Sequence, residues 1–271
     1  MRRALWLLVL AGCNQLLGLE PPPAPGGTGN PDAAAGGDAP IATGRTPYWT
    51  FSDDFELGDF RRWSTGGTSP DAVLEVDHTV AAAGCCSMHA RINAGAVGVA
   101  YKLITLQGDG PGGTVTAGTL AMRARIKATQ LAADTREIAI VQGGTSGSQF
   151  VTSGLGQISG GGFGWGYDAT DAAVDNRAKA STATVDDALG GWHCIEVVIN
   201  LGDAGHVAIF SDDLAVPLVE DDFNTLAQPG WDSATFGLPF SSGSALTELY
   251  LDDAVVSLYH DSDRGIHIGC K

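Results

Sequence analysis

Alternation of apolar and polar side chains is the feature that most restricts the fold of this chain. It is clearest between residues 118 and 127, where Leu120, Met122, Ala124 and Ile126 alternate with a polar set ending in Arg123, Arg125 and Lys127. A period of two is typical of a β-strand with one buried face. Further strands are expected at 71–78, 86–92, 98–105, 136–142, 162–168, 178–184, 192–200, 205–211, 234–238 and 246–259. Glycine-rich turns separate most of them, so the pattern predicts an all-β domain of two packed sheets.

The N-terminus has the layout of a secretory signal. Met1–Arg3 is basic, residues 4–10 are apolar, and the small pair Ala11–Gly12 precedes Cys13. The apolar run is much shorter than the ~20 residues of a membrane-spanning helix. Leu10-Ala11-Gly12-Cys13 resembles the lipobox of bacterial lipoproteins, which implies a signal peptide over 1–12, acyl chains such as palmitate on Cys13, and anchoring to a bacterial membrane. Asn14 after the cysteine favours the outer membrane or cell surface.

Residues 13–45 are expected to form a lipidated N-terminus and a disordered tether. Six prolines lie between positions 20 and 45 among Gly, Ala and Asp, with few large apolar side chains. Such a segment cannot bury enough surface to fold. The 26 residues from 20 to 45 would span about 30 Å as a flexible coil or about 80 Å as extended polyproline, and so would hold the folded domain away from the membrane.

The charge of the chain excludes one class of partner. Removal of residues 1–12 takes away Arg2 and Arg3 and no acid, which changes the formal net charge from −16 to −18. A strongly acidic chain is repelled by the phosphates of nucleic acid and of anionic lipid. We therefore expect no nucleic acid as partner and contact with the membrane only through the lipid on Cys13.

Three segments carry a family resemblance. Residues 51–63 (FSDDFELGDFRRW) resemble the first strand of concanavalin A-like lectin/glucanase jelly rolls. Residues 190–213, with Gly-Trp-His at positions 191–193, resemble the laminin-G-type hairpin, and 249–256 (LYLDDAVV) resemble the last strand of the same sandwiches. The resemblance implies a two-sheet antiparallel jelly-roll sandwich over 46–262, followed by a tail, 263–271. A galactose-binding-like jelly roll is the nearest alternative. These folds host lectins, hydrolases, lyases and adhesion modules, so the fold alone does not give the function.

Catalytic motifs are missing from the sequence. Glucanases of this architecture carry a Glu-x-Asp-x-x-Glu strand, which supplies two carboxylates about 5 Å apart, and this pattern does not occur here. There is also no nucleophile elbow, Walker loop or paired-histidine motif. Lyases of the same fold use Arg, Gln, His and Tyr, and no motif joins the candidates Arg123, Arg125, Gln142, His89 and Tyr167. The sequence favours binding over catalysis and assigns no catalytic residue.

Residues 162–167 alternate glycine with Phe163, Trp165 and Tyr167. On a strand these three aromatic side chains share one face, and bare backbone occupies the other. Facing outward, the aromatic rings form a platform for sugar rings. Facing the core, which large aromatic side chains commonly do, they leave a shallow groove that Arg123, Arg125 and Lys127 can line. The predicted carbohydrate-binding residues are Trp165, Tyr167, Arg123 and Arg125.

Calcium is the cofactor that the resemblance suggests. Related jelly rolls place acids of the first strand beside acids of the last, which here are Asp53, Asp54, Glu56, Asp252 and Asp253. Calcium takes six to eight oxygen ligands, many of them carboxylates. Adjacent aspartates at strand ends are also ordinary turn formers.

Four cysteines besides Cys13 indicate disulfides in an oxidising compartment. They are Cys85, Cys86, Cys194 and Cys270. Neighbouring cysteines pair only with strain, so we expect Cys85 and Cys86 each to bond Cys194 or Cys270, which would be a structural role.

The sequence as a whole predicts a membrane-anchored extracytoplasmic module of lectin-like type that is carbohydrate-binding or adhesive, with a polysaccharide or glycoprotein as partner. Two alternatives remain: a structural or protein-binding envelope lipoprotein without a sugar site, and a diverged polysaccharide hydrolase or lyase.

Overall fold

The structure, a computed structural model, describes residues 45–131, 141–144, 150–158, 161–170, 177–185, 187–212, 215–226, 229–241 and 245–270. The predicted signal peptide, Cys13 and the tether up to residue 44 lie outside the described residues, as does most of the expected strand 136–142. The described part of the chain is built of β-strands, with one 3-10 turn at Pro111–Gly113. Among these residues no helix has the length and apolar character needed to cross a membrane.

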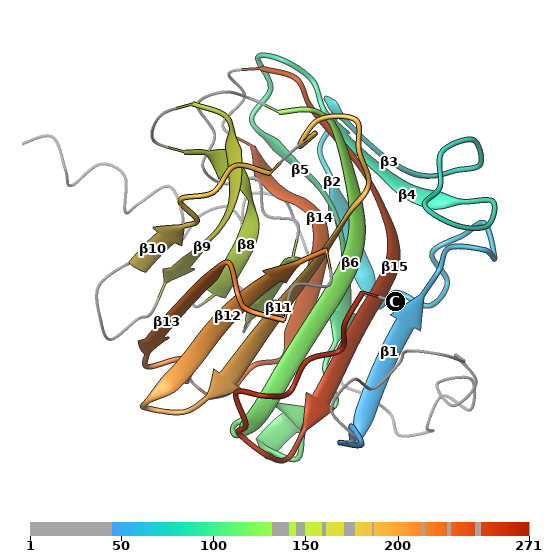
Figure 1. Ribbon diagram of the computed structural model, residues 1–271. Coiled ribbons are helices and arrows are strands. Elements are labelled where there is room, and N and C mark those ends of the chain that lie inside the picture. Colours follow the sequence, from blue (N-terminus) through green and yellow to red (C-terminus); the bar gives the residue numbers. More distant parts are fainter. Residues whose placement is uncertain are drawn as a thin grey trace, which may run out of the picture.

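The strands form two antiparallel sheets that face each other (Figure 1). One is eight-stranded, in the order β13-β12-β11-β6-β15-β4-β3, with β1 also paired to β15. The other is seven-stranded, in the order β10-β9-β8-β7-β14-β5-β2. The first sheet comprises β1 (Trp49–Asp53), β3 (Ala72–Asp77), β4 (Ser87–Ile92), β6 (Gly118–Gln130), β11 (His193–Leu201), β12 (Gly205–Ser211), β13 (Val219–Phe223) and β15 (Thr247–Tyr259). The second comprises β2 (Thr65–Thr68), β5 (Gly98–Thr105), β7 (Val141–Gly144), β8 (Phe150–Gln157), β9 (Phe163–Thr170), β10 (Arg177–Ala180) and β14 (Ser233–Ser241).

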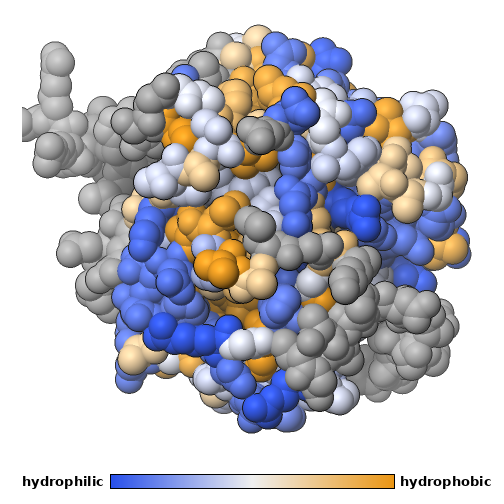
Figure 2. Space-filling model, in the orientation of Figure 1, coloured by the Kyte–Doolittle hydropathy of each residue, from blue (hydrophilic) through white to orange (hydrophobic). Residues whose placement is uncertain are grey.

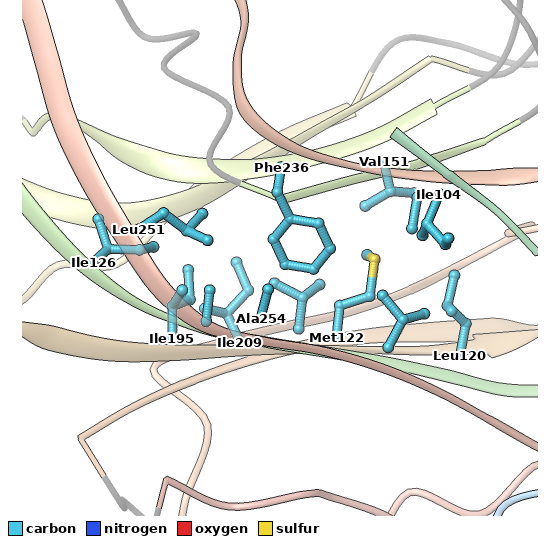
Figure 3. Packing of buried hydrophobic residues seen from close by; sticks show 14 of the residues in the cluster. Ile104, Leu120, Met122, Ile126, Val151, Ile195, Ile209, Phe236, Leu251 and Ala254 are labelled. Carbon is cyan, nitrogen blue, oxygen red and sulfur yellow. The ribbon is translucent and has the colours of Figure 1, made fainter. Parts of the chain in front are cut away.

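The core lies between the sheets and follows the alternation of the sequence. Leu120, Met122, Ala124 and Ile126 of β6 are buried in it, as the period of two predicts. Figure 3 shows Phe236 of the seven-stranded sheet pointing toward residues of the opposite sheet. The jelly-roll sandwich expected from the sequence is confirmed.

β15 carries a bulge that shifts its alternation. Its register with β6 breaks between Asp252 and Val255, and Asp253 has a positive φ of 50°. The buried set therefore changes phase, from Leu249 and Leu251 before the bulge to Ala254 and the alternate residues after it. With this bulge, β15 pairs with β4 in its first half and with β1 in its second half. The predicted pairing of the first and last strands is confirmed.

The C-terminal segment forms a second, smaller core on the outer face of the eight-stranded sheet. Ile266 and Ile268 are buried there, against outward-facing residues that include Val198, Phe210 and Tyr259. The buried Glu196 carboxylate accepts hydrogen bonds from the backbone N–H groups of Ile268 and Gly269. Disulfide Cys194–Cys270 closes this arrangement, so the middle of the outer face is covered by the chain itself.

The predicted disulfide connectivity is wrong. Cys85 bonds Cys86, and Cys194 bonds Cys270. The reason is the strand order: β4, next to the cysteine pair, is separated from β11 by β15 and β6. Three strand spacings amount to about 14 Å, whereas the Cα atoms of a disulfide lie within about 7 Å of each other. The strand order thus leaves the adjacent cysteines as each other's partners.

Candidate functional site

The aromatic residues of β9 are core residues. Trp165 has no exposed surface, and its Nε1–H donates to the Ser211 hydroxyl of the opposite sheet at 3.0 Å. Tyr167 is buried, stacks on Phe223, and donates its hydroxyl to Asp221 at 2.6 Å. Of the two orientations expected for these rings, the core-facing one is confirmed and the outward sugar platform is excluded, because both rings point between the sheets and neither side chain presents a face to solvent. Trp165 and Tyr167 are therefore wrong as carbohydrate-binding residues.

The glycines of β9 serve close packing more than an open groove. A Cβ at Gly164 would lie 2.7 Å from Ile158 and 2.8 Å from the Ser181 hydroxyl. A Cβ at Gly166 would lie 2.9 Å from the carbonyl oxygen of Lys179. Real Cβ atoms do not approach so closely, so neighbouring chain segments occupy part of the space that the sequence suggested for a ligand.

The two predicted arginines lie on the other sheet. Arg123 is buried, and its guanidinium donates to the carbonyl oxygen of Gly269 in the C-terminal segment at 2.8 Å. Arg125 pairs with Asp253 at 2.9 Å. They cannot line a groove with β9, because β6 and β9 belong to different sheets. The residues considered for a lyase site are also divided between the two sheets. Gln142 is in the seven-stranded sheet, and His89 packs against Tyr250 in the eight-stranded one.

The five predicted calcium ligands accept hydrogen bonds or form ion pairs within the protein. Asp53 is buried and accepts hydrogen bonds from the Trp63 indole at 2.7 Å and the Phe55 N–H. Burial raises the pKa of the Asp252 carboxyl to about 6, and its Oδ2 accepts the N–H groups of Ala82 and Ala83.

The other three acids are similarly engaged. Glu56 accepts the N–H of Cys85 at 2.8 Å, Asp54 accepts that of Glu56, and Asp253 pairs with Arg125. In the described part of the chain these five acids do not gather into a cluster of three carboxylates. These five residues do not fit a calcium site. Calcium binding by this protein stays a prediction, and these residues do not supply the site.

A different set of residues comes together on the outer face of the seven-stranded sheet. Strand register places one residue from each strand in a continuous line across it. We call this line the outer row: Thr65, Leu103, Thr235, Gln142, Thr152, Asp168 and Ala178. It lies opposite the core-facing row that contains Phe236 and Tyr167. Six strand spacings make it about 29 Å long.

The neighbouring line on this face combines glycine with one tyrosine. Tyr101 of β5 is flanked in register by Gly67 of β2 and Gly237 of β14, and Gly154 pairs with Gly166 farther along. The Tyr101 ring lies close over Gly67, where a Cβ would be 2.9 Å from ring carbon Cε1. Glycine at position 67 thus lets a half-buried aromatic ring lie against the sheet.

Burial affects the electrostatics of this face. Desolvation raises the pKa of the Tyr101 hydroxyl and of the Asp168 carboxyl. Thr235 is buried although it belongs to the outer row. Hydrogen-bonding groups shielded from water are better binding groups than freely solvated ones, because competition from water is reduced. The face therefore offers hydroxyl and carboxyl groups beside one aromatic ring, a combination suited to a ligand with many hydroxyls.

No local sequence pattern identifies the outer row. Its members are single residues from segments between positions 65 and 235, and no local motif contains two of them. Only the register between strands, set by the whole sheet, brings them into line.

Comparisons with known proteins give the fold. No protein-family model matches the sequence, and no curated protein matches it either. A solved structure of a cellulose-induced protein, Cip1, is 15% identical, with a TM-score of 0.53, and the match covers 82% of this chain and 100% of that one. An endo-β-1,4-glucuronan lyase from the fungus Trichoderma reesei is 14% identical, with a TM-score of 0.50, over 80% of this chain and 98% of that one. At these identities the likeness shows the jelly-roll fold alone.

Proposed function

We propose that this protein is a membrane-anchored module that binds a neutral polysaccharide along the outer row. The observation that carries the proposal is the row itself, about 29 Å long, in which strand register aligns Thr65, Thr235, Thr152 and Asp168 beside the ring of Tyr101. Sugar hydroxyls pair with Thr hydroxyls and with a carboxylate, and the apolar face of a sugar ring packs against an aromatic ring. The likeness in fold to a cellulose-induced protein and to a polysaccharide lyase is consistent with this proposal.

The composition of the row favours a neutral glycan over an acidic one. The row contains Asp168 and no basic residue, and the chain as a whole is strongly acidic. A polyuronate would meet repulsion along its length, with no cation in the row to balance it. This also disfavours a lyase acting on a uronic acid polymer, as the named fungal enzyme does, because such chemistry is helped by a group that neutralises the carboxylate.

The exposed apolar side chains of the described residues give no support for a hydrophobic protein partner. Among the described residues, the large apolar side chains that are exposed come from separate segments: Leu57, Val97, Leu189 and Val216. On the face that Figure 2 presents, apolar surface gathers in a hollow near the centre, and hydrophilic residues separate it from smaller apolar patches elsewhere. Large apolar docking surfaces are usually contiguous.

Tyr101→Ala is expected to weaken polysaccharide binding about five- to thirtyfold, since loss of a stacked ring removes about 1–2 kcal/mol. The measurement is isothermal titration of residues 14–271 with soluble neutral β-glucans, xylans and polyuronates. Tyr250→Ala is the matched control, because Tyr250 is also half-buried but lies on the outer face of the other sheet, stacked on His89.

Four outcomes would contradict the proposal. Equal loss in both variants, or loss in Tyr250→Ala alone, would remove the site from the outer row. Binding only to polyuronates would refute the neutral ligand. Release of reducing ends or unsaturated products on incubation would show catalysis in place of simple binding.

The lipid anchor is the other part of the proposal, and Cys13→Ser tests it. We expect wild-type chain made in a bacterium to start at an acylated Cys13 and to partition into detergent, and Cys13→Ser to lack acyl mass and to keep residues 1–12. Intact-mass spectrometry of the membrane fraction distinguishes the two. Identical masses apart from the substitution would exclude lipidation at this cysteine.

A further inference from the structure

The loop between β3 and β4 gathers three side chains that can bind a metal. Cys85 and Cys86 form a disulfide, and the His78 Nδ1 lies 3.2 Å from the Cys86 sulfur. The nitrogen and both sulfurs lie within 4.8 Å of one another, and no other group of three potential ligands as compact occurs in the described ranges. His78 and Cys85 are exposed, so reagents can reach the group.

This disulfide is poorly suited to stabilise the fold as a cross-link. It joins residues one position apart, so it removes little entropy from the unfolded chain. Cys194–Cys270, in contrast, joins residues 76 positions apart and secures the C-terminal segment. A bond that contributes little to stability and is accessible at one sulfur has the properties of a reversible redox pair.

The loop is fixed independently of the sulfur–sulfur bond. The N–H groups of Ala82 and Ala83 donate to Asp252, and that of Cys85 donates to Glu56 at 2.8 Å. At the start of the loop, Asp77 accepts the N–H of Val80 at 2.8 Å. These contacts keep the two sulfurs near His78 after the bond between them is broken, so the group remains preorganised.

We propose that reduction of Cys85–Cys86 creates a binding site for a thiophilic ion of the Zn²⁺ type, with His78 Nδ1 and the two sulfurs as ligands. A dithiol reductant supplies two electrons and two protons, is itself oxidised to a disulfide, and leaves two thiols. Each thiol releases its proton as it binds the ion. Two thiolates and one neutral imidazole form a tetrahedral set with one open position. In the oxidised chain the sulfurs are bonded to each other and the site is closed.

The proposal is tested by metal titration of the full chain, with Co²⁺ as spectroscopic probe and Zn²⁺ as competitor. After reduction with a phosphine, we expect one Co²⁺ per chain and a sulfur-to-cobalt charge-transfer band in the near ultraviolet, absent from the oxidised chain. His78→Ala should weaken the affinity by about tenfold or more, because it removes one of three ligands from an exposed loop position.

Two cysteine variants separate this site from the other pair of sulfurs. Cys85→Ser/Cys86→Ser should abolish the band, and Cys194→Ser/Cys270→Ser should keep it. The proposal is overturned if the reduced wild-type chain shows no thiolate band, or if reduced Cys85→Ser/Cys86→Ser binds Co²⁺ as the wild type does. An affinity unchanged by His78→Ala would remove the histidine from the site.

Discussion

Replacing Cys194 and Cys270 together by alanine is expected to lower the free energy of unfolding by about 4.5 kcal/mol, the value for a loop of this length. The bond joins β11 to a segment 76 positions later, so the unfolded chain gains much freedom when it is lost. It also holds the C-terminal segment over the second core. In that segment Ile266 and Ile268 are buried, and two of its backbone N–H groups donate to the Glu196 carboxylate. Urea denaturation followed by tryptophan fluorescence measures the change.

The adjacent cysteine pair provides the matched control. Cys85→Ala/Cys86→Ala also removes one disulfide, yet we expect a loss below about 1 kcal/mol, because the bond spans neighbouring residues. Equal losses in the two double variants would show that the C-terminal segment is held by its buried side chains and hydrogen bonds alone.

Trp165→Ala is expected to cost about 3–5 kcal/mol, the usual range when a large core side chain is truncated and a cavity is left. Trp165 has no exposed surface and crosses the core to the Ser211 hydroxyl of the opposite sheet, so the substitution removes both packing and a buried hydrogen bond. The measurement is again equilibrium denaturation, with binding of the polysaccharide determined in parallel. Sugar binding should fall only as far as the folded fraction falls.

Trp165→Phe separates the two contributions, because it keeps most of the ring volume and removes the indole N–H. We expect it to cost about 1–3 kcal/mol, in part for the Ser211 hydroxyl that it leaves without its donor. If Trp165→Ala kept its stability and lost sugar binding, the side chain would have to face a ligand, and its buried position in β9 would be refuted.

Strand positions were the part of the fold most accessible from the sequence. The expected strands 98–105 and 205–211 coincide with β5 and β12, since each is a short run rich in apolar, β-branched and aromatic side chains. β2, β8 and β13 were missed. Their sequences, TGGT, FVTSGLGQ and VEDDF, have glycines or acids where a strand pattern needs apolar side chains. Such segments become strands because neighbours in the sheet satisfy their backbone groups.

The candidate site was much harder to predict from the sequence than the strand positions. Trp165 and Tyr167 were placed on one face of a strand correctly, but alternation alone does not say which face is inward. Arg123 and Arg125 were assigned to the same groove although their strand belongs to the other sheet. Tyr101, Thr152 and Asp168 carried no local signal, because each depends on register across several strands.

The sequence by itself determined that apolar and polar side chains alternate as in β-strands, that the strands form a sandwich, and that the first and last strands are neighbours. These properties depend on patterns within a few residues or on a family resemblance. The tertiary structure alone decided the disulfide partners, the orientation of the β9 aromatics, the covering of one outer face by the C-terminal segment, and the outer row on the other. The physical reason is that strand order and register are set by the summed packing of both sheets, which no single segment encodes.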